Sequence, residues 1–113
     1  MNKREKGSHY EQIAAACLIR QGYEILEQNY RGRHGEIDLI ARESGYLVFI
    51  EVKYRKDGRF GDPAEAVDRK KQGRIRQAAR CYLFQNGYGE EEPCRFDVVS
   101  ILGEEITVLQ NAF

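Results

Sequence analysis

The stretch that most constrains the fold runs from residue 36 to residue 53, where two apolar segments flank a Ser44-Gly45 pair. Segments 39–41 and 47–50 are apolar and partly β-branched, which is typical of buried strands. A Ser-Gly pair between two such segments predicts a two-residue hairpin turn. We therefore expect an antiparallel hairpin at the centre of a sheet.

Four charged residues lie near the open end of this hairpin. With the turn at Ser44-Gly45, Asp38 lies opposite Glu51. Glu36 then lies opposite Lys53, and all four side chains project from one face because side chains alternate along a strand. Opposed Cβ atoms are about 4.5–5.5 Å apart, so the two carboxylates repel each other. A divalent cation such as Mg²⁺ or Mn²⁺ would remove that repulsion.

This set of groups suits phosphodiester hydrolysis. The metal activates water and stabilises charge on the phosphate. Lys53 can orient or help deprotonate that water and offset the developing negative charge. The alternative is a purely structural cluster of cross-strand salt bridges, which leaves Asp38 against Glu51 unexplained. A one-residue slip at the turn would move these two acids to opposite faces.

The length of 113 residues predicts one domain, residues 1–113. With 18 basic and 18 acidic residues the net charge is zero, so overall charge indicates no class of partner. The distribution is uneven, because residues 53–80 hold ten Lys or Arg against four acids. Residues 90–113 hold one Arg against six acids. We expect a basic surface beside the carboxylates.

The three cysteines are widely spaced, and no Cys-x-x-Cys motif is present. This spacing argues against a zinc knuckle and predicts reduced thiols in a cytoplasmic protein. No apolar run is long enough to span a membrane, so we expect no membrane association.

The first ordered element is expected to be a helix over residues 8–21. Ser8 can cap it, and Glu11 three residues later completes a capping-box pattern. Glu11 has a second interpretation, as a third carboxylate that points towards the metal site.

The remaining elements complete a mixed α/β domain with one main sheet flanked by helices. Asp62 and Pro63 predict the start of a helix that reaches residue 85, with a break allowed near residues 67–68. Further strands are expected over 23–30, 95–102 and 105–109. The expected order is α-β-β-β-α-β-β.

Basic residues around the hairpin are candidates for binding a nucleic-acid backbone. They lie in the turn before residue 36, in the loop after Lys53 and off the apolar face of the second helix. A solvated surface is the alternative for each of them, and His34, without a partner in the sequence, is expected to be solvated. The candidates are Arg31, Arg33, Arg55, Lys56, Arg59, Lys70, Lys71 and Arg74.

Several segments carry a resemblance to a known family. They are Asn29-Tyr30-Arg31, residues 35–40 and residues 48–53, with 71–83 and 95–99 in support. The arrangement resembles the PD-(D/E)-x-K nuclease fold of type II restriction enzymes and archaeal Holliday-junction resolvases. Almost the whole chain is similar, more closely, to the small bacterial YraN-like family of predicted endonucleases.

The resemblance implies roles for five residues. Asp38 and Glu51 would be metal ligands, with the backbone carbonyl of Val52 as a further ligand. Lys53 would be the catalytic lysine, and Glu11 matches an accessory acid on the first helix.

Two features bear on how specific the match is. The residue before Asp38 is Ile37, where the motif's name has proline, and many members of the fold lack that proline. A second acid-x-Lys triplet, Asp68-Arg69-Lys70, is expected to be helical, where residues two apart do not share a face.

The sequence leads to the hypothesis of a metal-dependent endonuclease that acts on nucleic acid, in the first place DNA. One alternative is a non-catalytic nucleic-acid-binding or adaptor module that retains the fold. Another is a structural or protein-interaction domain, which predicts no salt-dependent binding of nucleic acid. A domain of this size that cuts both strands of a duplex is expected to act as a homodimer.

Overall fold

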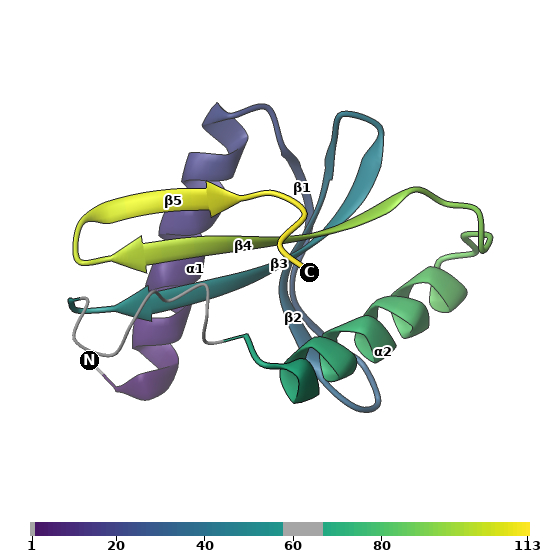
Figure 1. Ribbon diagram of the computed structural model, residues 1–113, viewed down its shortest axis with the longest axis horizontal. Coiled ribbons are helices and arrows are strands. Elements are labelled where there is room, and N and C mark those ends of the chain that lie inside the picture. The colour runs from purple at the N-terminus through teal and green to yellow at the C-terminus, as the bar shows by residue number, and fades with distance from the viewer. Residues whose placement is uncertain (1, 58–66) are drawn as a thin grey trace.

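The computed structural model describes residues 2–57 and 67–113. Within these residues, two helices and five strands follow one another in the expected order α-β-β-β-α-β-β (Figure 1). Within the described residues, neither helix is long and apolar enough to cross a membrane. The elements are α1 (Lys3–Arg20), β1 (Glu24–Arg31), β2 (Glu36–Glu43), β3 (Tyr46–Arg55), α2 (Arg69–Gln85), β4 (Cys94–Leu102) and β5 (Glu105–Leu109).

The five strands form one mixed sheet in the order β1-β2-β3-β4-β5. Three of the four neighbouring pairs are antiparallel, and β3 and β4 are parallel. Parallel neighbours need a long crossover, and the segment that contains α2 provides it. The expectation of a mixed α/β domain with one main sheet is confirmed.

The central hairpin has the expected register. Ser44 and Gly45 both have positive φ, 52° and 82°, as the two central residues of a type I′ turn require. Glu43 pairs with Tyr46, and the ladder continues to the pair of Leu39 with Ile50. This ladder fixes which side chains of β2 and β3 reach each face.

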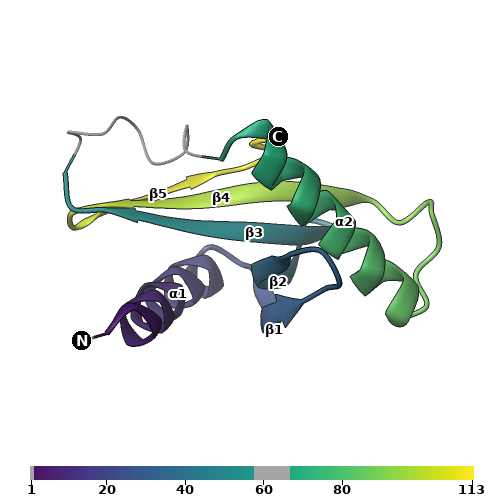
Figure 2. The same ribbon diagram turned by 90° about the horizontal axis from the view of Figure 1, so that it is seen from below.

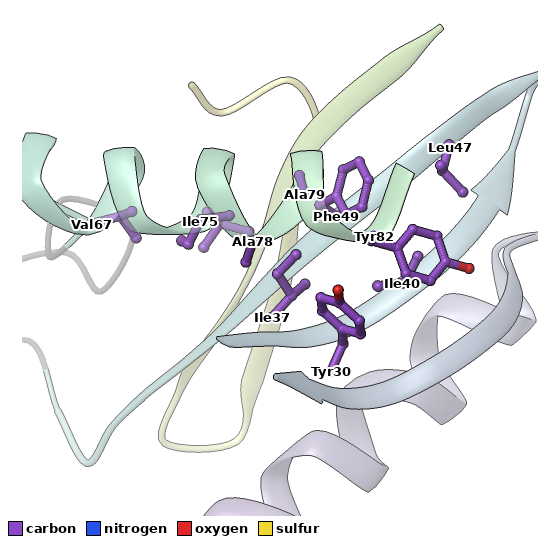
Figure 3. Close-up of a cluster of buried hydrophobic side chains, with 11 residues drawn as sticks. Tyr30, Ile37, Ile40, Leu47, Phe49, Val67, Ile75, Ala78, Ala79 and Tyr82 are labelled. Carbon is purple, nitrogen blue, oxygen red and sulfur yellow. The ribbon is translucent and has the colours of Figure 1, made fainter. Parts of the chain in front are cut away.

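The helices cover opposite faces of the sheet (Figure 2). Leu39 and Ile50 face α1, and Ile40 and Phe49 face α2, so adjacent residues of a strand enter different cores. Figure 3 shows the α2 side, where the helix packs against side chains of the three N-terminal strands. Burial on both faces explains why these strands are almost continuously apolar.

The first helix begins earlier than expected. It starts at Lys3, and Asn2 caps it by accepting a hydrogen bond from the Glu5 amide over 2.8 Å. The expected cap at Ser8 is therefore wrong, and Ser8 lies inside the helix. Asn is as good a cap as Ser, and the exposed, polar residues up to His9 can continue the helix into solvent.

The second helix begins at Arg69, with Asp68 as its cap. The Asp68 side chain accepts a hydrogen bond from the Lys71 amide over 2.8 Å. The start expected at Asp62 and Pro63 lies outside the described residues. The expected end at Gln85 is confirmed.

A buried polar network ties the C-terminal strands to the start of β1. Arg95 donates to both Asp97 carboxylate oxygens, each over 2.9 Å. The Tyr23 hydroxyl donates to Asp97 Oδ2 over 2.7 Å. Gln110 donates to the Tyr23 hydroxyl over 3.0 Å, and the Asn111 amide donates to Asp97 Oδ1 over 2.9 Å. Asp97 is 0% exposed, so its charge depends on these partners.

Candidate functional site

Asp38 is held against β3 by the main chain of Val52. The Val52 amide donates a hydrogen bond to Asp38 Oδ2 over 2.8 Å. The β2–β3 ladder ends at Leu39 and Ile50, so Asp38 lies just beyond its last pair, and the expected direct pairing of Asp38 with Glu51 is not part of the ladder. A half-buried carboxylate of β2 is thereby fixed beside the segment of β3 that also carries the other predicted catalytic groups.

Glu51 is buried and is contacted by two ammonium groups. Its side chain is 6% exposed. Lys71 Nζ lies 2.7 Å from Glu51 Oε1, and Lys53 Nζ lies 3.7 Å from the same oxygen. The structure therefore places Lys53 at the carboxylates as expected, and adds a second lysine from α2.

Glu36 is not part of this cluster. The expected pairing of Glu36 with Lys53 is wrong, because the two strands stop pairing at Leu39 and Ile50. Glu36 is exposed and forms a surface ion pair with Arg31 at 3.6 Å. The central charged group therefore contains two hairpin carboxylates, where the sequence predicted three.

Glu11 supplies the third carboxylate. Its capping-box interpretation is wrong, since α1 begins five residues before Ser8. Glu11 is buried on the side of α1 that faces the sheet, and its charge acts on Asp38. The amide nitrogen of Asn29, oriented towards Glu11, lies 2.7 and 3.1 Å from the two carboxylate oxygens. Its backbone has a positive φ of 54°, which Asn tolerates better than most residues.

The negative charge of each carboxylate makes ionisation of its neighbours less favourable. Burial, followed by the charges of Glu51 and Glu11, raises the pKa of Asp38 to about 8, although Lys71 opposes the shift. Burial also raises the pKa of Glu11. Burial lowers the pKa of Lys53, and the neighbouring Lys71 lowers it further. Additional positive charge at this position would stabilise the ionised acids.

The donor groups suit a hard divalent cation. Carboxylate oxygens from β2 and β3 converge with a third acid from α1, and such oxygens are the usual ligands of Mg²⁺. Across residues 2–57 and 67–113, no three Asp, Glu, His or Cys side chains are arranged to hold a metal by themselves. A main-chain oxygen or water would have to complete the ligand set. The contact that the structure gives to Val52 is through its amide, and its carbonyl as a ligand stays a prediction.

A groove between the turn at 31–35 and the first half of α2 is lined by Lys71, whose ammonium contacts Glu51. It encloses about 770 Å³ and brings together three of the predicted nucleic-acid-binding residues, Arg31, Lys71 and Arg74. His34 is exposed, as expected, and also lines this groove. Glu36 is the acid among its lining residues.

Two glycines allow this turn to lie against α2. A Cβ on Gly35 would lie 3.0 Å from the carbonyl oxygen of Arg74, and a Cβ on Gly32 would lie 3.1 Å from the Cα of Ala78. The Gly32 amide donates to the Gly35 carbonyl oxygen over 2.8 Å, which closes the turn. Both close contacts are with backbone atoms, which cannot move aside cheaply.

The other predicted basic residues are less closely associated with the carboxylates. Arg33 and Lys70 are exposed and do not line this groove. Arg55 donates to the Tyr54 carbonyl oxygen over 3.0 Å at the end of β3, and Lys56 next to it is exposed. Arg59 lies outside the described residues.

A second groove follows the N-terminal half of α1 and reaches Asp38. Tyr10 and Tyr54 stack along it with ring centroids 3.8 Å apart. Arg31 and Glu36 line both grooves, so the two grooves adjoin at these residues.

Two features of the site were missed from the sequence. Lys71 was predicted to bind phosphate, but its contact with Glu51 links residues 20 positions apart on different elements, for which no local pattern exists. In the sequence, Asn29 stands out only as part of the Asn29-Tyr30-Arg31 segment that resembles the nuclease family. Its tolerance of a left-handed backbone is the one local signal that could have marked it.

Comparison with known sequences finds relatives that all carry the same family name. A UPF0102 protein of Lachnoclostridium phytofermentans is 54% identical over 113 residues, which cover 100% of this chain and 96% of that protein. One from Nitrosomonas europaea is 49% identical over 111 residues, covering 96% and 92% of the two chains. One from Fusobacterium nucleatum is 43% identical over 111 residues, covering 98% and 92%. The names of these relatives state no activity. The family model described as "Uncharacterised protein family UPF0102" matches residues 10–101, and the chain therefore belongs to this family.

Proposed function

We propose that this protein is a metal-dependent endonuclease of the PD-(D/E)-x-K type, which hydrolyses phosphodiester bonds in nucleic acid, in the first place DNA. The observation that carries the proposal is the hydrogen bond between the Val52 amide and Asp38. It holds an acid of β2 against β3 at the centre of the Glu51-Val52-Lys53 segment. An isolated acid-x-Lys triplet is common, whereas a triplet with a facing acid fixed to its middle residue is not expected by chance.

Each residue has a role in this proposal. Asp38 and Glu51 would hold Mg²⁺ or Mn²⁺, with the Val52 carbonyl oxygen as a further ligand. When bound, the ion supplies Lewis-acid activation of water and neutralises charge on the phosphate. The Lys53 ammonium, 3.7 Å from Glu51 Oε1, donates to the attacking water or to a phosphate oxygen. The charge of Glu11 acts on Asp38 from the α1 side, and Glu11 would orient water there.

The groove between the 31–35 turn and α2 would hold the strand next to the scissile phosphate. Arg31, Lys71 and Arg74 present cationic groups along it. Phosphate contacts of this kind position a nucleic acid without reading its sequence.

A cleavage assay on a panel of branched, single-stranded and duplex DNAs and RNAs, with Mg²⁺ or Mn²⁺, tests the proposal. Asp38→Asn and Lys53→Ala remove a ligand and the lysine, and Glu104→Gln removes an exposed acid of the β4–β5 turn as a matched control. We expect metal-dependent cutting by the wild type and by Glu104→Gln, and at least a hundredfold slower cutting by the other two. Light scattering of the same preparation measures its molar mass in solution and so tests the expected homodimer.

The second candidate is a nucleic-acid-binding or adaptor module without turnover. It is favoured by the two lysines that already neutralise Glu51, which would allow the fold to persist without a metal. Binding of nucleic acid by the wild type and by Asp38→Asn with equal affinity, and no cutting of any substrate, would support this candidate.

A further inference from the structure

Among the described residues, the shortest ion pair to Glu51 is made by Lys71, which lies outside the predicted motif. Lys71 Nζ lies 2.7 Å from Glu51 Oε1, a full ångström closer than Lys53 Nζ. The Glu51 side chain is 6% exposed, so its charge depends on cationic partners, because a buried carboxylate without one is strongly destabilising. Lys71 is 37% exposed, so its ammonium also borders solvent.

The start of α2 positions this lysine. The Asp68 side chain accepts the hydrogen bond of the Lys71 amide over 2.8 Å. The next residue, Gln72, donates its side-chain amide to the Val67 carbonyl oxygen over 3.0 Å. The helix cap thereby fixes the backbone of Lys71 at the position from which its side chain reaches Glu51.

We propose that Lys71 neutralises Glu51 in the metal-free protein and competes with a divalent cation for this carboxylate. This inference rests on the proposed metal site at Asp38 and Glu51. When a cation takes over Glu51, the Lys71 ammonium is released towards the groove that it lines with Arg31 and Arg74. Lys71 is then a binding residue for phosphate, so that metal loading and substrate binding are linked through one side chain.

Direct Mn²⁺ binding tests the competition without any turnover. Free Mn²⁺ is measured by electron paramagnetic resonance during titration of the wild type, Lys71→Met, Lys71→Arg and Lys70→Met. Lys71→Met removes a positive charge beside the cation, so we expect its Kd for Mn²⁺ to fall about tenfold at low ionic strength. Lys71→Arg retains the charge and is expected to stay near the wild type. Lys70 is the exposed neighbour, and Lys70→Met is expected to change the Kd less than twofold.

The variants also separate charge from folding. If circular dichroism shows that Lys71→Met is unfolded, Lys71→Gln replaces it, because Gln keeps a hydrogen-bond donor for Glu51. Lys71→Gln is also expected to bind Mn²⁺ more tightly than the wild type. In one outcome the wild type binds Mn²⁺ and Asp38→Asn abolishes that binding, but the folded neutral variant binds Mn²⁺ no more tightly than the wild type. This outcome would overturn the role of Lys71 and leave the proposed metal site intact. Wild-type Mn²⁺ binding that is absent, or unaffected by Asp38→Asn, would overturn both this inference and the proposed metal site.

Discussion

At the residue scale, the site depends on acids placed where their charges oppose one another. Asp38 and Glu51 come from the neighbouring strands β2 and β3, and Glu11 comes from α1, which covers one face of the sheet. Two lysines offset part of this charge. A folding argument gives no advantage to such an arrangement, because like charges brought together in a partly buried position destabilise the native state.

The titration of Asp38 provides a test in the metal-free protein. Burial and Glu51 raise the folded-state pKa of Asp38 to about 8, well above its ordinary value of 3.8. Because the pKa is higher in the folded state, the contribution of Asp38 to the free energy of unfolding is fully present below about pH 4. It is lost as the pH rises towards 8. We expect the wild-type Tm, measured with chelator, to fall more between pH 5 and 8 than that of Asp38→Asn. Parallel Tm profiles for the two proteins would contradict the shift.

The buried hydroxyl of Tyr23 is predicted to contribute to stability. It donates to Asp97 and accepts from Gln110 and Arg95, so Tyr23→Phe leaves these groups with one partner fewer. We expect the free energy of unfolding to fall by about 1–3 kcal/mol in urea melts. Tyr46→Phe is the control, because Tyr46 is exposed and its ring under Arg95 is retained in Phe. Equal losses in the two variants would contradict the role of the network.

At the element scale, the register of the hairpin could be predicted and its open end could not. The Ser44-Gly45 turn determines the register of every pair down to Leu39 and Ile50. Beyond that pair the strands separate, a change that depends on tertiary packing and leaves no signal in periodicity. Asp38 does lie beside β3, where it accepts from the Val52 amide. The expected direct pairs of Asp38 with Glu51 and of Glu36 with Lys53 are not part of the ladder.

The packing of the 31–35 turn on α2 is predicted to need Gly35. A Cβ there would lie 3.0 Å from the Arg74 carbonyl oxygen, so Gly35→Ala must push the turn away from the helix. We expect a loss of about 1–3 kcal/mol in the free energy of unfolding and weaker nucleic-acid binding. Gly73→Ala is the matched control, since nothing lies within 4 Å of its Cβ and Ala favours a helix by about 1 kcal/mol. A Gly35→Ala protein as stable as Gly73→Ala would contradict the close packing.

At the scale of the whole molecule, a chain with zero net charge concentrates its basic residues beside its acids. The sequence predicted this excess around residues 53–80 but could not say which cations reach the site. The fold determines which cations do so, because the turn before β2 packs on α2 at Arg74 and Ala78 and the groove beside it is lined by Lys71 and Arg74. Lys71 therefore contacts Glu51 and Arg74 lines the groove beside it, whereas Lys70 is exposed.

This placement predicts different effects for two arginines of α2. Arg74 lines the groove, and Arg80, two turns further along, is exposed outside it. We expect Arg74→Ala to weaken nucleic-acid binding about three- to tenfold and to reduce the slope of log K against log salt by about one. Fluorescence anisotropy at several salt concentrations measures both quantities. An equal effect from Arg80→Ala would indicate a diffuse surface in place of a groove.

The most direct test compares two acids of β2 that lie two residues apart. Cleavage of the most susceptible nucleic acid in saturating Mg²⁺ is measured for the wild type, Asp38→Asn and Glu36→Gln. We predict that Asp38→Asn loses at least a hundredfold in rate. Glu36→Gln removes an exposed acid that lines both grooves and pairs with Arg31, and is predicted to cut within a fewfold of the wild type. Cutting that survives in Asp38→Asn, or a wild type that cuts no substrate, would contradict the assignment of Asp38 and Glu51 as the centre of a nuclease.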